Sequence, residues 1–138
     1  MTISIQSPEE LQEFIGKVNN VYKEDYQSRA FTVAMVDQKG DLSFFYRFGS
    51  PKLLTIELTQ RKAYTSSRMG VATKDFLSRL QNEKLEISYF ADEKFTALPG
   101  GLPVFDTNGQ CIGGVAVGGL SAQEDHEAAE TLCALLKS

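Results

Sequence analysis

The apolar positions of this chain recur with two spacings, one typical of helices and one of strands. Near the N-terminus, the residues at helical spacing are Leu11, Phe14, Ile15, Val18 and Tyr22. Ser7 can cap this helix, Pro8 suits its first position, and Glu10 completes a capping box. The pattern predicts a first helix from Pro8 to about Tyr26.

Segments rich in β-branched, aromatic or small residues predict two hairpins. Phe31–Asp37 and Leu42–Phe48 flank a Gln-Lys-Gly-Asp turn. Leu102–Asp106 and Cys111–Val117 flank Thr-Asn-Gly, and an Asn-Gly pair between such segments is a strong hairpin signal. Because strands joined by tight turns are antiparallel, an antiparallel sheet is expected.

Two helices are predicted between the hairpins. Thr55 can cap one that runs to about Gly70, and Thr73 can cap a shorter one through about Leu80. The segment Gln81–Lys94 is ambiguous, because its LEISYF stretch has strand character between charged flanks. As a strand, it would be the fifth of the sheet.

A last helix is predicted after the Gly118-Gly119 pair. Ser121 and Glu124 form a second capping box. The apolar positions behind it are Ala122, Ala129, Leu132, Cys133 and Leu136. The order α-β-β-α-α-(β)-β-β-α predicts an α+β fold, in which an antiparallel sheet of about five strands is flanked by helices. The length of 138 residues predicts a single domain over residues 1–138.

Charge and composition exclude several classes of function. The net charge of −4 leaves no basic stripe for nucleic acid. No apolar run approaches the ~18 residues of a membrane span. The N-terminus lacks the basic start and apolar segment of a signal peptide, so a cytoplasmic location is expected. Cys111 and Cys133 have no CxxC or framework spacing and are interpreted as small buried apolar residues.

Three segments together resemble the haem-degrading, HbpS-like family, which includes the glycolate-operon G proteins and the C-terminal domain of propanediol-utilisation O proteins. The segments are Val33–Arg47 (VAMVDQKGDLSFFYR), Gln60–Ser67 (QRKAYTSS) and Pro99–Glu127 (PGGLPVFDTNGQCIGGVAVGGLSAQEDHE). The resemblance covers roughly residues 8–137 and includes an ending, GLS followed by EDH, that is similar to one sub-branch of the family. It implies a profilin-like sheet and assembly into a ring of subunits.

The resemblance also implies a choice of ligands, because some members of the family bind haem and others are tied to cobalamin or diol metabolism. This chain departs from the haem-binding members, because its first helix carries no histidine where theirs can ligate iron. Any haem iron here would need His126, a tyrosine such as Tyr22 or Tyr64, or a methionine.

Lys62 is the first candidate site residue. Leu58, Lys62, Thr65 and Met69 share one face of the second predicted helix. A half-buried lysine needs an anionic partner, either a carboxylate of a ligand or an acidic residue of the last helix. The alternative is a lysine whose stem covers the core while its ammonium reaches water. Asp125 shares the apolar face of the last helix, so it is expected to point inward with Lys62 as its candidate partner.

Glycines and the single histidine complete the candidate site. Gly100, Gly101 and Gly119 could line a pocket with backbone N–H groups, or they could only permit tight turns. His126 could act as a general base, a metal ligand or a haem ligand, or it could form a hydrogen bond at a subunit or helix contact. No nucleophile–base arrangement and no phosphate-binding loop is visible.

These observations predict a protein that binds a small ligand and acts as a homo-oligomer. The ligand would be haem, another tetrapyrrole or a small anionic metabolite. The residues expected at its site are Lys62, Thr65, Gly100, Gly101, Gly119, Asp125 and His126. Two alternatives stay open: an enzyme or enzyme accessory in glycolate- or diol-type metabolism, and an oligomeric assembly protein without a ligand.

Overall fold

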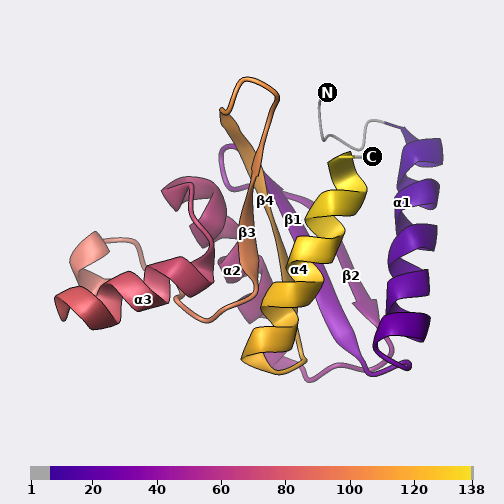
Figure 1. Cartoon of the computed structure of the whole chain (residues 1–138), viewed down its shortest axis with the longest axis horizontal. Coiled ribbons are helices and arrows are strands. Elements are labelled where there is room, and N and C mark those ends of the chain that lie inside the picture. The colour runs from indigo at the N-terminus through magenta and orange to yellow at the C-terminus, as the bar shows by residue number, and fades with distance from the viewer. Residues whose placement is uncertain (1–6, 138) are drawn as a thin grey trace.

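The computed structural model describes residues 7–137. The first six residues of the N-terminal segment, in which no signal peptide is expected, lie outside the described residues. Its centre is a four-stranded antiparallel sheet with the order β2-β1-β4-β3, flanked by helices (Figure 1). The strands are β1 (Phe31–Asp37), β2 (Leu42–Phe48), β3 (Gly101–Phe105) and β4 (Cys111–Gly118). The predicted α+β class and both hairpins are therefore confirmed.

The sheet has four strands rather than five, because the ambiguous segment does not join it. Ile87–Phe90 forms a short 3₁₀-helix, η2. The Phe90 ring packs edge to face against Phe76 of helix α3 (Thr73–Glu83), with ring centroids 5.0 Å apart. Phe95 also packs against the Phe76 ring, at a centroid distance of 5.9 Å. Phe90 of this segment is therefore used in an aromatic cluster on α3, and the expectation of a fifth strand was wrong.

The first helix begins where the capping box predicts. Helix α1 spans Pro8–Asn20, and the Glu10 backbone N–H donates to Ser7 Oγ at 3.1 Å. The chain then continues as a π-helical turn, η1 (Val21–Asp25), which brings the helical segment close to the expected end at Tyr26.

The last helix, α4 (Ala122–Lys137), is also capped as predicted. The Glu124 backbone N–H donates to Ser121 Oγ, and the Ser121 backbone N–H donates to Glu124 Oε1, both at 3.2 Å. Both halves of the capping box are therefore formed.

The two threonine caps predicted for the middle helices are wrong. Helix α2 spans Leu54–Met69, and neither it nor α3 has a side-chain cap. Thr55 and Thr73 lie inside these helices, and both are buried. The Thr55 hydroxyl bonds the hydroxyl of Thr32 at 2.7 Å, and Thr73 Oγ1 accepts from a backbone N–H of β3 at 3.0 Å. Their hydroxyls therefore hold each helix to the sheet.

Helices α1 and α4 cover one face of the sheet, and α2 covers the other (Figure 1). The first face carries the larger core, which includes Phe14, Val18, Phe31, Val33, Val115, Val117 and Leu132. The second face is lined by small side chains, and its core consists of Ala34, Val36, Ala63 and Ala116.

Helix α2 lies close to the sheet because glycines stand beneath it. A Cβ added to Gly114 would collide with the carbonyl oxygen of Ala63, and one added to Gly101 would collide with the carbonyl oxygen of Lys62. Both obstacles are backbone atoms of α2, which cannot move without shifting the helix. The glycines of β3 and β4 are therefore needed for packing.

We expect Gly114→Ala to lower the free energy of unfolding by about 1–3 kcal/mol, the usual cost of overpacking. Gly16→Ala is the matched control, because Gly16 lies on α1 with nothing within 4 Å of its Cβ position, and it should raise stability by up to about 1 kcal/mol. Urea unfolding of both variants measures the difference. Equal stabilities would contradict the close packing of α2.

Candidate functional site

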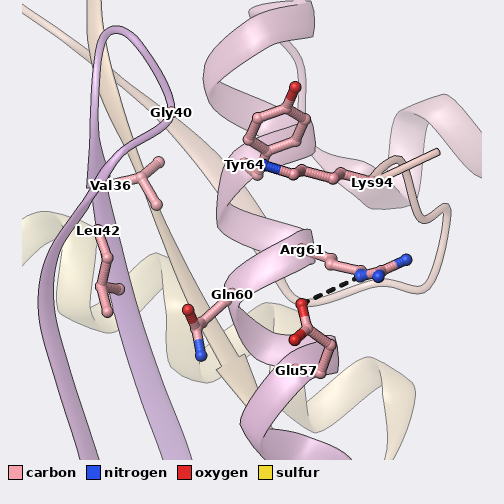
Figure 2. Close-up of a pocket in the computed structure, with 8 residues that line it drawn as sticks. All are labelled: Val36, Gly40, Leu42, Glu57, Gln60, Arg61, Tyr64 and Lys94. Atoms are coloured by element: carbon pink, nitrogen blue, oxygen red, sulfur yellow. Dashed lines mark hydrogen bonds and ion pairs between the residues drawn. The ribbon is translucent and has the colours of Figure 1, made fainter. Parts of the chain in front are cut away.

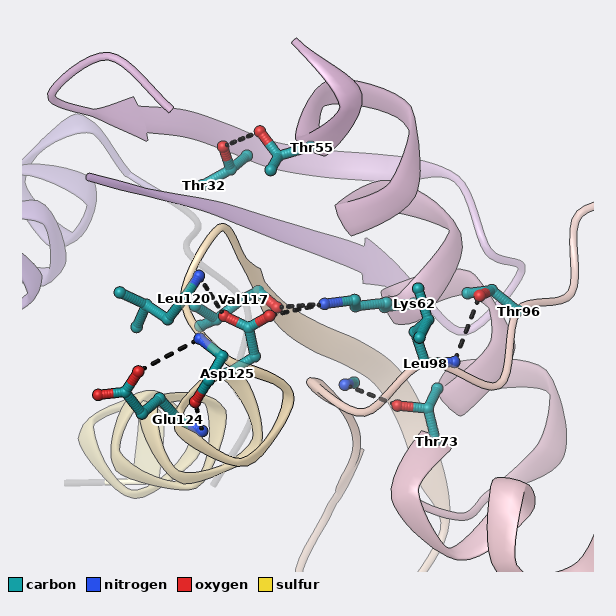
Figure 3. Close-up of polar contacts among 12 residues, drawn as sticks. Thr32, Thr55, Lys62, Thr73, Thr96, Leu98, Val117, Leu120, Glu124 and Asp125 are labelled. Atoms are coloured by element: carbon teal, nitrogen blue, oxygen red, sulfur yellow. Dashed lines mark hydrogen bonds and ion pairs between the residues drawn. The ribbon is translucent and has the colours of Figure 1, made fainter. Parts of the chain in front are cut away.

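Lys62 reaches from α2 past the end of the sheet to α4 on the other face (Figure 3). The residue is 2% exposed, and its Nζ donates to the Val117 carbonyl and to Asp125 Oδ2, both at 3.0 Å. The ion pair expected between Lys62 and Asp125 is thus present. The alternative of an ammonium in water was wrong.

Glycines make room for the Lys62 side chain where it passes from one face of the sheet to the other. A Cβ on Gly100 would lie 2.9 Å from Lys62 Nζ and 3.0 Å from the Asp125 Cβ, and one on Gly118 would lie 3.7 Å from Lys62 Nζ. The φ of Gly100 is +127°, a conformation that L side chains rarely adopt. Packed protein, rather than an open pocket, surrounds these glycines.

Burial shapes the electrostatics of the pair. Desolvation lowers the pKa of Lys62 and raises the pKa of Asp125, and the attraction between the two charges opposes both shifts. Asp125 Oδ1 also accepts the Leu120 backbone N–H at 2.9 Å. Each charge therefore depends on partners that are fixed in place.

Two further predicted residues have structural partners. The Thr65 hydroxyl donates to the Arg61 carbonyl at 2.8 Å and accepts the Thr96 backbone N–H at 3.0 Å, so it ties α2 to the segment before β3. Gly119 lies in the turn between β4 and α4 with φ +110°, and a Cβ there would lie 3.3 Å from the Ala30 carbonyl oxygen.

His126 differs from the other predicted site residues. Its side chain is 13% exposed, and Nε2 lies 3.6 Å from Oε2 of the exposed Glu130. Its Nδ1 is buried and has no hydrogen-bond partner within the described part of the chain. A buried polar atom without a partner is uncommon in folded proteins, and Arg47 Nε, Thr59 Oγ1 and Ser66 Oγ share this state.

A pocket of about 90 Å³ lies away from these residues, between the β1–β2 turn and the outer face of α2 (Figure 2). Arg61, Tyr64 and Lys94 are among the side chains that line it. Sequence reasoning did not find it. Nothing in the sequence links Arg61 of α2 to Lys94, which lies in the segment before β3.

Residues 7–137 contain neither a candidate metal cluster nor a candidate membrane-spanning helix. No group of three or more His, Cys, Asp or Glu side chains there could hold a metal ion. No helix in that range combines the length and the apolar character needed to cross a bilayer. Cys111 and Cys133 form no disulfide with each other and are half-buried, so they are less buried than expected.

A second ion pair fixes the start of α4. Arg29 donates to both carboxylate oxygens of Glu124, at 2.8 and 2.6 Å. The hydrogen bond from Arg29, helped by the backbone and side-chain hydrogen bonds of Ser121, lowers the pKa of Glu124 to about 2 from its ordinary 4.5.

We expect Lys62→Met to lower the free energy of unfolding by about 3–5 kcal/mol, because it leaves Asp125 buried without its countercharge. The double variant Lys62→Met/Asp125→Asn should recover much of this loss, because the uncompensated charge is gone. Urea unfolding measures both. Lys74→Met, at an exposed lysine, should change stability by less than about 0.5 kcal/mol. A Lys62→Met protein as stable as this control would contradict a structural role for the pair.

The Glu124 pair predicts an acid-dependent loss of stability. Because the folded-state pKa lies below the ordinary value, the pair stabilises the fold above about pH 4.5, and its contribution disappears as the pH falls toward about 2. Thermal melts at low salt between pH 2 and 6 should therefore be less pH-dependent for Glu124→Gln than for the wild type. Parallel pH profiles would show that the pair adds nothing.

Comparisons with known proteins agree with this fold. The sequence model of the family described as "Haem degrading protein HbpS-like" matches residues 8–134. No curated protein matches the chain significantly.

Solved structures give further similarities. The chain resembles PduOC in a crystal structure with haem (24% identity, 95% of this chain and 94% of that one, TM-score 0.77). It also resembles ORFY of Klebsiella pneumoniae (20% identity, 100% and 97%, TM-score 0.81) and a double mutant of HbpS from Streptomyces reticuli (22% identity, 99% and 86%, TM-score 0.76). At these identities the structures show a shared fold. Since the family model spans nearly the whole chain, the protein belongs to the HbpS-like family.

Proposed function

We propose that this protein binds a haem-related small ligand and acts as a homo-oligomer in the cytoplasm. Membership of a family described as haem-degrading supports a tetrapyrrole ligand. The structure of PduOC in complex with haem supports it too, because the folds agree over most of both chains. The observation that carries the proposal in this chain is the position of His126, whose Nε2 has only the exposed carboxylate of Glu130 as its partner, at 3.6 Å.

The described residues fit haem through His126. Neither α1 nor η1 contains a histidine, so the ligand to iron must come from another element. Imidazole is a common axial ligand of haem iron, and Nε2 of His126 becomes available when the exposed Glu130 turns toward solvent. A bound haem would supply an iron centre, while His126 would hold it at the start of α4.

The two tyrosines considered as alternative ligands are less suited. The Tyr22 ring packs against Phe31 and Phe48, with centroids 5.7 and 5.6 Å away. The Tyr64 hydroxyl donates to Asp92 Oδ2 at 2.7 Å. Both phenols are therefore already engaged in contacts within the fold.

The size of the ligand requires an open site. The pocket beside α2 measures about 90 Å³, whereas sites for drug-sized ligands measure roughly 300–1,000 Å³. Haem is therefore too large for that pocket, and a macrocycle held by His126 would lie beside α4, with a second copy of the chain to cover it. Exposed apolar side chains support self-association, among them Leu53 (75% exposed), Leu54 (68%) and Tyr89 (65%).

Haemin titration followed by absorbance tests this function. We expect a saturable Soret change near ~400 nm in the wild type and in Gln123→Ala, an exposed control on the same helix. Binding should be at least tenfold weaker in His126→Ala, because the imidazole is lost. Light scattering on the same samples gives the mass of the binding species.

Two outcomes would contradict the proposal. An identical titration of all three proteins would exclude His126 as the iron ligand. A wild type without a saturable change would exclude haem as the ligand.

A further inference from the structure

We propose that the pocket beside α2 is a second binding site, specific for a small organic carboxylate. It lies across the outer face of α2, between the β1–β2 turn and the segment that contains Lys94 (Figure 2). None of the predicted site residues lines it. The inference does not depend on haem binding.

The charges at this pocket favour an anion. Arg61 and Lys94 contribute two cations and Glu57 one carboxylate, so the lining is net positive in a chain of net charge −4. Glu57 Oε2 accepts from Arg61 Nε at 3.2 Å, but its side chain is 71% exposed. Such exposed pairs are weak, so Glu57 neutralises Arg61 only in part.

Lys94 is the cation that is available to a ligand. Its ammonium rests 5.3 Å from the centre of the Tyr64 ring. The charge of Lys94 helps to lower the pKa of Asp92, but no carboxylate of the described residues lies within 4 Å of the ammonium. A cation over an aromatic face keeps its outer N–H groups free to donate. An anion in the pocket would receive them.

Neighbouring contacts hold Lys94 and Tyr64 in place. Asp92 accepts the Tyr64 hydroxyl at 2.7 Å and the Lys94 backbone N–H at 3.0 Å, so one carboxylate fixes both residues. On the opposite side, a Cβ on Gly40 would lie 2.7 Å from the Tyr64 ring, and the φ of Gly40 is +89°. The turn therefore packs directly on Tyr64, and the pocket is preorganised.

The remaining walls define the rest of the ligand. Val36 and the half-exposed Leu42 give the pocket an apolar side opposite the charged one. Gln60 Nε2 donates to the Ile56 carbonyl at 2.9 Å, which turns its amide along the helix. A carboxylate on a chain of two or three carbons matches both the size of about 90 Å³ and this division into charged and apolar walls.

Propionate is the probe we would use, with amide chemical shifts of the full-length protein as the readout. We expect saturable shifts confined to residues near Gly40, Leu42 and Lys94. The affinity should be at least about tenfold lower in Lys94→Gln, which removes the cation but keeps part of the aliphatic stem. Lys74→Gln, at an exposed lysine of α3, should bind as the wild type does.

Propionamide, which has the same shape without the charge, tests whether the anion matters. It should bind much more weakly than propionate. Equal affinities for the two probes, an unchanged affinity in Lys94→Gln, or propionate shifts spread over the whole surface would each overturn the proposal. Because Lys94 is exposed, Lys94→Gln should fold normally, and the positions of its other amide signals show whether it does.

Discussion

The buried ion pair between Lys62 and Asp125 determines how the layers of this fold are joined. One partner belongs to the helix on one face of the sheet and the other to a helix on the opposite face. A lysine side chain can make this connection only where the strands end and no side chain blocks its path. The glycines at the start of β3 and the end of β4 provide that path, so glycine content, helix placement and the ion pair depend on one another.

Much of this arrangement could be predicted from the sequence, because it rests on local signals. The hairpins follow from strand composition and turn residues, and the meeting of Lys62 and Asp125 follows from helical spacing on two amphipathic helices. The predictions that were wrong, the two threonine caps and the fifth strand, concern features that tertiary contacts decide. Hydroxyls that resemble helix caps are used instead against the sheet, and the segment around Ile87 packs on a helix rather than beside a strand.

The candidate site could be predicted only in part for the same reason. Sequence spacing identified side chains that point inward, but an inward side chain can serve packing as well as binding. The pocket beside α2 combines Arg61 and Lys94, which are brought together by the loop after α3. Notably, Arg61 and His126 each stand next in sequence to a member of the buried pair, so the pair anchors the backbone of both candidate sites.

Helix α3 and the segment after it extend away from the sheet (Figure 1). Their apolar residues pack largely on one another through Phe76, Phe90 and Phe95. The start of α3 joins them to α2 and β3, and Asp92 and Phe95 contact Tyr64 of α2. Such a unit can open without unfolding the main core. Amide hydrogens of α3 would then exchange with solvent at a lower free-energy cost than those of β1 and β4.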